Sequence, residues 1–334
     1  MTDITLEQAG AKKSSLFSTA ALQKGVAFVV LIALLAFFSI FTENFAAWNN
    51  MVNIMQATAV NGVLGVAVTF VIISGGIDLA VGTMMTLTAV MAGLVLTNLG
   101  MPLPVGIAAA LASGGVMGLI SGSAIAKLKI PPFIATLGMM QISRGLALVF
   151  SGAKPIYFNS TPNYKYLSPE SSISSLIPGF EVPNGVFIMF GVAIAASIVL
   201  NRSLFGRYIF ALGSNEEAAR LSGVNVDFWK ILTYALSGAI CGVAGLLISS
   251  RLNSAQPALG LGYELDAIAA VVIGGTSLSG GRGTILGTII GAFIMSVLTN
   301  GLRSMGVQEE WKIVVTGVII MVAVFVDIIL RRRA

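Results

Sequence analysis

The chain has 334 residues, of which 56% are hydrophobic and 10% charged, with a net charge of +5 and a mean hydropathy of +0.93. A soluble domain of this length cannot bury so large an apolar share, so we expect a lipid bilayer to be its solvent. Histidine is absent and Cys241 is the single cysteine. Histidine-based catalysis, imidazole or thiolate metal sites and an intrachain disulfide are therefore excluded.

The sequence predicts an all-α, polytopic membrane protein with about ten transmembrane helices, some of them broken. A polar tail, residues 1–24, precedes the transmembrane domain, residues 25–329, and residues 330–334 form a basic end. Asp266 and a glycine-rich end make the span at 265–279 a candidate broken or re-entrant helix. The ten candidate spans are 25–41, 51–73, 79–99, 103–125, 133–151, 185–200, 231–250, 265–279, 284–299 and 311–329.

The distribution of Lys and Arg predicts the orientation. With ten spans, 13 of the 19 basic residues fall on the side that holds both termini, 5 fall on the other side, and Arg144 lies inside a span. Cytoplasmic loops retain positive charge, so both termini are expected in the cytoplasm of a bacterial cell, with the protein in the inner membrane. The basic excess thus reflects topology and anionic lipid, and no nucleic-acid partner is expected.

A long polar loop, residues 151–184, follows the fifth span on the external side and contains five of the ten prolines. It is too polar to enter the bilayer. Two interpretations stay open, because the loop is either a passive tether between spans or a surface that receives an extracytoplasmic partner.

The second polar segment, residues 201–230, faces the cytoplasm and contains a short predicted helix. Ser214 and Glu217 have the spacing of a capping box, and Gly223 suits a left-handed helix end. Glu216 and Arg220 form an i,i+4 pair, and two alanines allow close approach of another protein. The segment therefore predicts a docking lever made of Ser214, Asn215, Glu216, Glu217, Ala218, Ala219, Arg220 and Gly223.

Two glycine-rich passages repeat each other weakly. Residues 75–82 read GGIDLAVG and residues 274–281 read GGTSLSGG, each after an apolar run. Both follow spans that run inward, which predicts two halves related by a parallel repeat. A chance match and close helix packing at the glycines are the alternative interpretations.

Four ionisable residues are predicted near membrane depth: Asp78, Glu264, Asp266 and Arg144. Such groups are costly in a bilayer unless they are paired or hydrated, which makes each a functional candidate. An ion pair between Arg144 and one carboxylate is one interpretation, and a polar translocation path is the other.

Several motifs together resemble a known family. The run EEAARLSG is similar to the coupling segment of permease subunits of ATP-binding-cassette importers. With GGIDLAVGT, PPFIATLGMM and QPALGLGYELDAIAAVVIGGTSLSGGRGT, the chain from about residue 49 onward resembles the ribose-type monosaccharide permeases. No GxxxxGK[ST] phosphate-binding loop is present, so ATP is not hydrolysed by that machinery in this chain.

The resemblance implies a permease without enzyme activity of its own, paired with a second permease copy. A separate cytoplasmic ATPase would hold ATP and Mg²⁺, a periplasmic protein would deliver the sugar, and this chain would bind no cofactor. Polar residues and helix breaks would line the sugar path. The candidates are Asn61, Thr69, Gly75, Gly76, Asp78, Gln141, Arg144, Asn253, Gln256, Glu264, Asp266, Gly274 and Gly275.

Two other functions compete with the importer permease. In an ion-coupled secondary transporter, Asp78, Asp266 and Arg144 would relay a proton or a cation, and uptake would collapse with the ion gradient. A channel-like or purely structural membrane protein fits the hydropathy but leaves the EEAARLSG segment without a role.

Overall fold

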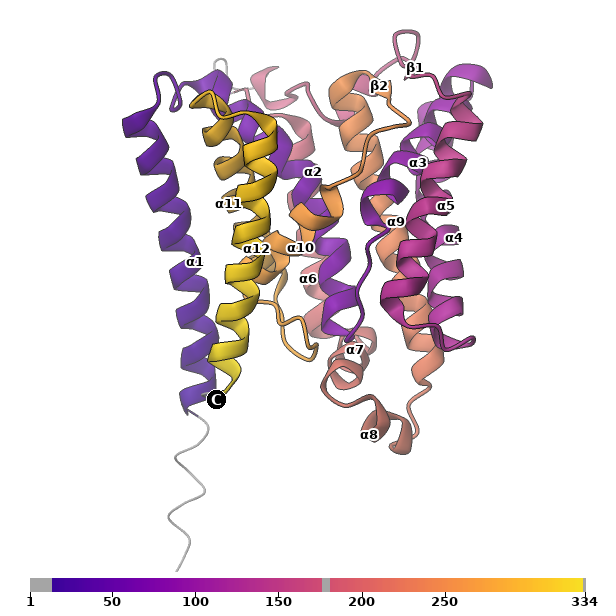
Figure 1. Ribbon diagram of the computed structural model, residues 1–334. Helices are drawn as coiled ribbons and strands as arrows, with labels where there is room; N and C mark the ends of the chain where they lie inside the picture. Colours follow the sequence, from indigo (N-terminus) through magenta and orange to yellow (C-terminus); the bar gives the residue numbers. More distant parts are fainter. Residues whose placement is uncertain (1–13, 176–180, 333–334) are drawn as a thin grey trace, which may run out of the picture.

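The computed structural model describes residues 14–175 and 181–332, and within these ranges it is mostly helical (Figure 1). The all-α class is confirmed. One small antiparallel pair joins β1 (Ile156–Tyr157) to β2 (Ser254–Ala255), with Ile156 opposite Ala255. The main helices are α1 (Ser14–Phe41), α2 (Trp48–Ile73), α3 (Val81–Gly93), α4 (Leu103–Ala126), α5 (Pro132–Ser151), α6 (Asn184–Arg202), α7 (Leu204–Ser214), α8 (Glu216–Leu221), α9 (Val226–Leu252), α10 (Tyr263–Ile273), α11 (Ile285–Ser304) and α12 (Glu309–Arg332).

Seven helices in the described part of the chain are long and apolar enough to cross a membrane. They are α2, α3 with its π-helical extension η1 (Leu94–Asn98), α4, α5, α6, α9 and α11. The outer helices leave large apolar side chains exposed, among them Val29 of α1, Val149 of α5 and Ile194 of α6. Such faces have no place in water, so the chain is a polytopic membrane protein.

The ends of the predicted transmembrane domain differ in detail. α1 begins at Ser14, so the last part of the tail predicted at residues 1–24 is helical, while residues 1–13 lie outside the described residues. α12 extends to Arg332 into the basic end predicted at residues 330–334, and residues 333–334 also lie outside them.

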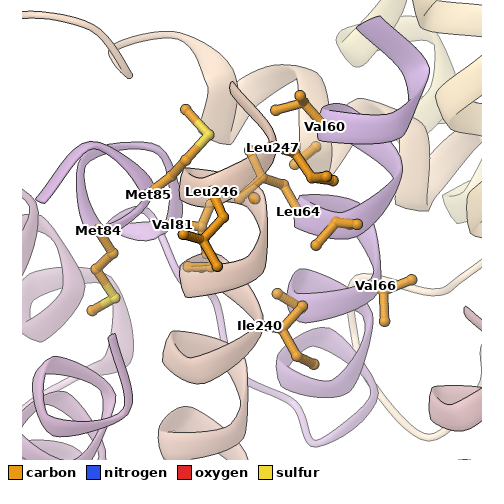
Figure 2. Packing of buried hydrophobic residues seen from close by; sticks show 14 of the residues in the cluster. Val60, Leu64, Val66, Val81, Met84, Met85, Ile240, Leu246 and Leu247 are labelled. Carbon is orange, nitrogen blue, oxygen red and sulfur yellow. The ribbon is translucent and has the colours of Figure 1, made fainter. Parts of the chain in front are cut away.

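α2 forms the centre of the bundle, and its second half, Gly62 to Ile73, is buried on all sides. Val60 and Leu64 of α2 lie beside Ile240 and Leu247 of α9, and the side chains of α3 close the other side of α9 (Figure 2). An apolar helix segment without a polar face requires neighbours on every side. This packing holds α2 and α9 together through the depth of the bundle.

α4 and α9 approach each other through glycines. A Cβ on Gly114 would overlap the carbonyl oxygen of Gly238, and a Cβ on Gly238 would overlap that of Gly114. Small residues permit this approach of two backbones, which is a main source of helix association in lipid. The glycines of these two helices therefore carry packing.

The two ends of the bundle carry different structures (Figure 1). α7 and α8 lie at the same end as the first residues of α1 and the last residues of α12, and β1 and β2 lie at the opposite end. α10 has only 11 residues and stops at a glycine-rich break, as predicted for the irregular span at 265–279. The break after α2 lies toward the end that holds α7.

Candidate functional site

The polar segment after α6 folds into two short helices. The Ser203 hydroxyl accepts a hydrogen bond from the N–H of Gly206 at 3.2 Å and starts α7. After α8, the Asn225 side chain accepts from the N–H of Phe228 at 3.1 Å and starts α9. Capping residues favour a helix start at these points, so the short elements are defined locally.

The predicted capping box of Ser214 and Glu217 is wrong. Asn215 caps α8, because its Oδ1 accepts a hydrogen bond from the N–H of Ala218 at 2.9 Å. Ser214 is the last residue of α7, whereas Asn215 has the extended backbone that a cap requires. Glu217 is exposed and has no partner in the described part of the chain. The helix end is as predicted, since Gly223 has a φ of +83°.

An ion-pair network joins α8 to the start of α9. The Glu216 carboxylate accepts from Lys230 Nζ at 2.6 Å and from Arg220 at 3.4 Å, the predicted i,i+4 pair. Arg220 also reaches Asp227, which lies 3.0 Å from Lys129 Nζ in the α4–α5 connection. Partial burial raises the pKa of Glu216, but its bonds to Lys230 and Arg220 outweigh burial and leave that pKa below its ordinary value.

The outer surface of α8 presents an apolar tip that the sequence analysis missed. Leu221 is 83% exposed, and Ala218 beside it is exposed as well. Beneath α8, an open depression of about 440 Å³ lies between α7 and α8, with Tyr208 and Ala219 on its walls. An exposed aliphatic side chain on a short polar helix is a candidate contact for a partner protein. The position of Leu221 within the EEAARLSG motif could have identified it from the sequence.

Three glycine-containing segments, at the end of α2, in α7 and after α10, pack against one another. The N–H of Gly281 donates to the carbonyl oxygen of Ile73 at 2.9 Å, which joins the break after α10 to the end of α2. Gly213 of α7 packs against the same carbonyl, where a Cβ would overlap the oxygen. A Cβ on Gly280 would lie 3.0 Å from the Cα of Gly75. We call Ile73, Gly75, Gly213, Gly280 and Gly281 the glycine junction.

The two glycine-rich breaks have the same backbone geometry. Gly75 and Gly275 have φ values of +82° and +86°, and each donates to the carbonyl three residues earlier at 2.9 Å. The following residues, Gly76 and Thr276, donate to Val71 and Val271 at 3.0 and 3.1 Å. Both breaks are therefore helix ends with a left-handed glycine, but the structure pairs Gly75 with Gly275, one residue out of register with the sequence repeat, which aligns Gly75 with Gly274.

The neighbouring glycines of the repeat are packed against other elements. A Cβ on Gly76 would overlap the hydroxyl of Tyr234, and a Cβ on Gly274 would overlap the carbonyl oxygen of Gly287. Both positions therefore require glycine for close approach.

Asp78 is fully buried in the first break. Its carboxylate accepts from the N–H of Ala80 at 3.0 Å and from the hydroxyl of Ser237 at 3.2 Å. It thus ties the start of α3 to α9. Arg144 lies half-buried on α5 and forms no ion pair with any described residue. The predicted ion pair with a carboxylate is therefore absent from the described structure.

A polar cavity of about 780 Å³ opens between α2, α10, α11 and α12. Of the predicted path residues, Asn61 and Asp266 line it, and they come from two different helices. The other lining residues were missed, and three of them, Ser296, Thr299 and Asn300, lie on one segment of α11. Their spacing of three and four residues was a usable signal, since it places Ser296, Thr299 and Asn300 on one helix face.

The other predicted path residues lie elsewhere. Thr69 shares a hydrogen bond with Thr288 at 2.7 Å, and Gln141 is exposed on α5. Asn253 bonds to Asn159, and Gln256 donates to the Ser254 hydroxyl at 2.9 Å, both near β2. Glu264 is buried and accepts from the N–H of Gly262 at 3.1 Å. Neither these residues nor Gly75, Gly76, Gly274 and Gly275 line the cavity.

This geometry defines a multi-pass membrane protein of the transport class, with broken helices, a polar cavity and a structured lever at one end. Residues 50–324 match the model of the family described as "Branched-chain amino acid transport system / permease component", and the chain belongs to that family.

Curated relatives include the ribose import permease protein RbsC of Escherichia coli K12, which is 43% identical over 93% of this chain and 95% of the relative. The fructose import permease protein FrcC of Rhizobium meliloti is 38% identical over 92% and 85%. The xylose transport system permease protein XylH of E. coli K12 is 34% identical over 94% and 93%.

Proposed function

We propose that this chain carries a monosaccharide across the inner membrane by alternating access. It is the permease of an ATP-binding-cassette sugar importer, a transport component rather than an enzyme. The observation that carries the sugar assignment is that relatives covering nearly the whole chain are named for ribose, fructose and xylose. A ribose-like pentose or a related sugar is the proposed cargo. ATP and Mg²⁺ bind to the separate ATPase.

The proposed topology has ten passes with both termini in the cytoplasm. Besides the seven apolar spans, α1 and α12 run the length of the bundle (Figure 1). α10, together with the segment that leads from β2 into it, accounts for one broken pass. The end of the bundle that holds α8 also holds the first residues of α1 and the last residues of α12. The excess of Lys and Arg on that side supports its cytoplasmic assignment.

α8 is proposed to bind the ATPase. Leu221 supplies an apolar anchor, Glu217 is a free carboxylate beside it, and the ion-pair network holds the helix on α9. Glu217→Arg reverses a charge at this surface without breaking a bond within the chain. It is expected to weaken ATPase assembly while the chain still inserts. Glu43→Arg is the control, because Glu43 is exposed beyond α1 at the opposite end.

The glycine junction is proposed to transmit movement of α8 into the membrane. α8 follows α7 with only Asn215 between them. Gly213 of α7 packs directly on the end of α2 and on the backbone of Gly281, between α10 and α11. A helix that transmits movement must contact the element whose two states it shifts. Here the contact is between backbones, so no flexible side chain lies between α7 and the breaks. The two repeated breaks would therefore move together.

A second copy of the chain is proposed to cover α5. Gln141 is exposed on this apolar helix, and Gly138 and Gly145 lie on the same face with open space around them. An uncovered amide within the bilayer is unfavourable, whereas glycines allow a second helix to approach closely. The proposed assembly is therefore a homodimer with two copies of the ATPase.

The external loop is proposed to receive the periplasmic sugar-binding protein. Tyr164 in η2 (Tyr164–Leu167) stacks on Phe158 with ring centroids 3.9 Å apart, and its hydroxyl bonds to Ser249 at 2.6 Å. Ser250 donates to the Tyr164 carbonyl at 2.8 Å. These contacts hold the loop on α9, which favours a formed surface over a passive tether. Exposed Tyr157 and Tyr166 supply contact area.

The test is mild-detergent purification of the tagged chain from its host, followed by mass spectrometry and sugar uptake in reconstituted vesicles. Recovery of a cassette ATPase, its loss in Glu217→Arg and its retention in Glu43→Arg would support the proposal. Sugar uptake that follows an ion gradient with no ATPase present would instead establish the secondary transporter.

A further inference from the structure

We propose that Leu261 and Leu265 form the apolar barrier that closes the solute path of this chain near the middle of the membrane, and that Thr86 holds this barrier in place. The inference rests on the proposed function, since a barrier of this kind matters only in a chain that carries a solute by alternating access. It assigns the closing of the path to two side chains and one hydrogen bond.

The starts of α3 and α10 meet deep inside the bundle. A Cβ on Gly82, in the first turn of α3, would overlap the carbonyl oxygen of Gly260, just before α10. α3 rises about 17 Å from Gly82 to Gly93, which packs on Ile156 of β1 at the external end. α10, with 11 residues, runs about 17 Å from this meeting point toward the glycine junction at the other end. In a hydrocarbon core about 30 Å thick, the meeting point therefore lies near the middle.

The polar cavity extends from the external end to this depth and stops there. Its lining residues on α2, α11 and α12 fall within 50–61, 296–304 and 309–320, the parts of these helices nearest β1 and β2 (Figure 1). On α10 they are confined to the first turn, Tyr263, Leu265 and Asp266. None of the described residues of α7 or of the glycine junction lines the cavity. The cavity therefore belongs to the external half of the bundle.

Leu261 and Leu265 present open apolar surface to this cavity. They are 43% and 47% exposed, lie four positions apart, and both line the cavity. Gly262 between them is exposed as well, and the backbone ahead of α10 is not helical. Exposed irregular backbone at this depth is tolerated only against water or protein, so the two leucines do not face lipid. Apolar side chains in a water-filled path form a constriction that excludes water and polar solutes.

A single side chain attaches the barrier segment to α3. The buried Thr86 hydroxyl donates to the carbonyl oxygen of Leu259 at 2.7 Å, one turn beyond the contact of Gly82 with Gly260. Thr86 is thus a positioning residue, which fixes the barrier without facing the solute. α10 carries Leu265 in its first turn and ends at the glycine-rich break, so a shift of the glycine junction would move the barrier directly.

The first test measures passive leak, which needs neither ATP nor an identified cargo. The whole importer is reconstituted in vesicles loaded with radiolabelled D-ribose, and efflux is followed without ATP and without the binding protein. Leu261→Ser and Leu265→Ser are each expected to speed efflux by roughly tenfold or more, because the hydration penalty of one leucine is removed from the barrier. Leu119→Ser is the matched control, since Leu119 is 45% exposed on α4 and does not line the cavity.

The Thr86 variants test the positioning role. Thr86→Val removes the hydrogen bond to Leu259 and keeps the shape of the side chain. At equal amounts of reconstituted importer, it is expected to speed efflux by roughly twofold to tenfold, the effect of one lost hydrogen bond. Thr86→Ser keeps the hydroxyl and should match the unmodified importer. Unchanged efflux in Thr86→Val would overturn the positioning role.

Thiol labelling shows independently what the barrier residues face. Cys241 is buried, so Leu265→Cys supplies the accessible thiol of this chain. A charged, water-soluble thiol reagent is expected to modify Leu265→Cys when added on the external side and not when added on the cytoplasmic side. Leu119→Cys should resist the reagent from both sides. Modification of Leu265→Cys from both sides or from neither is incompatible with a one-sided barrier and overturns the proposal.

The outcomes separate the barrier from the importer. If the unmodified importer takes up a sugar with ATP but Leu261→Ser and Leu265→Ser leak no faster than Leu119→Ser, the barrier assignment is wrong and the proposed function stands. If the unmodified complex imports no sugar with ATP while the two serine variants leak, the barrier is supported and the sugar-import proposal fails.

Discussion

The carbonyl oxygen of Ile73 accepts a hydrogen bond from the N–H of Gly281 at 2.9 Å, which joins the end of α2 to the glycine-rich connection between α10 and α11. Ile73 ends α2 just before the first break, and Gly281 is the last residue of the second glycine-rich passage. Gly213, two residues before the cap of α8, packs on the same carbonyl. Through Gly213, the junction thus connects α8, the proposed ATPase-binding helix, to both breaks.

Gly213→Ala is expected to impair transport strongly. The added methyl group would overlap the Ile73 oxygen, so α7 must shift, at about 1–3 kcal/mol. Sugar uptake should fall while the ATPase remains bound and hydrolyses ATP, as measured in reconstituted vesicles. Gly191→Ala on α6 is the control, because no atom lies within 4 Å of its added Cβ. Equal uptake by both variants would contradict a role for the junction.

Asn215→Ala is expected to loosen α8, whereas Ser214→Ala leaves it intact. Loss of a helix cap costs about 1 kcal/mol, and Asn215 is the residue whose side chain accepts from Ala218. Hydrogen exchange of the backbone amides of α8 measures the difference directly. Faster exchange in Ser214→Ala than in Asn215→Ala would restore the capping box that the spacing predicts.

The ion-pair network predicts a specific pH dependence. The pKa of Glu216 lies below its ordinary value, so its contribution to α8 stability is complete above that ordinary value and is lost as the pH falls through the lowered one. Protection of the α8 amides should therefore be constant near neutral pH and decline only in acid. Lys230→Met should move the decline to higher pH. An unchanged profile in Lys230→Met would argue against the Lys230 contact.

Two substitutions of Asp78 distinguish a structural role of this residue from a role in transport. Asp78→Ala removes the acceptor of both the Ala80 N–H and the Ser237 hydroxyl, at about 1–3 kcal/mol for each buried group left unpaired. The amide oxygen of Asp78→Asn can still accept from Ala80. We expect low membrane abundance for Asp78→Ala and near-normal abundance for Asp78→Asn. Normal abundance of Asp78→Asn with abolished uptake would instead support a direct role in the path.

The α5 face predicts a cross-link between two copies. Gln141→Cys is expected to form an intermolecular disulfide in the membrane, because the proposed second copy covers this position. Ile194→Cys is the control, since Ile194 is 61% exposed on α6, outside the proposed contact. Non-reducing electrophoresis reads out the product. Cross-linking of Ile194→Cys alone would move the interface to α6.

Hydropathy was sufficient for the class of fold. Runs of apolar residues predicted α2, α4, α5, α6, α9 and α11 close to their observed ranges, because the bilayer leaves few alternatives to a helix. The break after residue 274 was also predicted, since Asp266 and consecutive glycines do not fit an ordinary span. These features depend on local composition alone.

Contacts between particular residues were harder to predict from the sequence. The cap at Asn215 could have been found from residue preference, but the spacing of Ser214 and Glu217 matched a known motif and misdirected the assignment. The shared cavity of Asn61 with Ser296 and Asn300 depends on how α2 packs against α11, which no local pattern encodes. The contact of Gly213 with Ile73 likewise depends on tertiary packing.

The glycine contact between α4 and α9 limits where the molecule can flex. Where the backbone of Gly114 lies against that of Gly238, sliding one helix past the other would drive carbonyl groups into each other. These two helices must therefore move as one rigid body during a transport cycle, and any hinge has to lie outside this pair. Conformational exchange measured by paired spin labels should be silent across α4 and α9 and visible between α7 and α11.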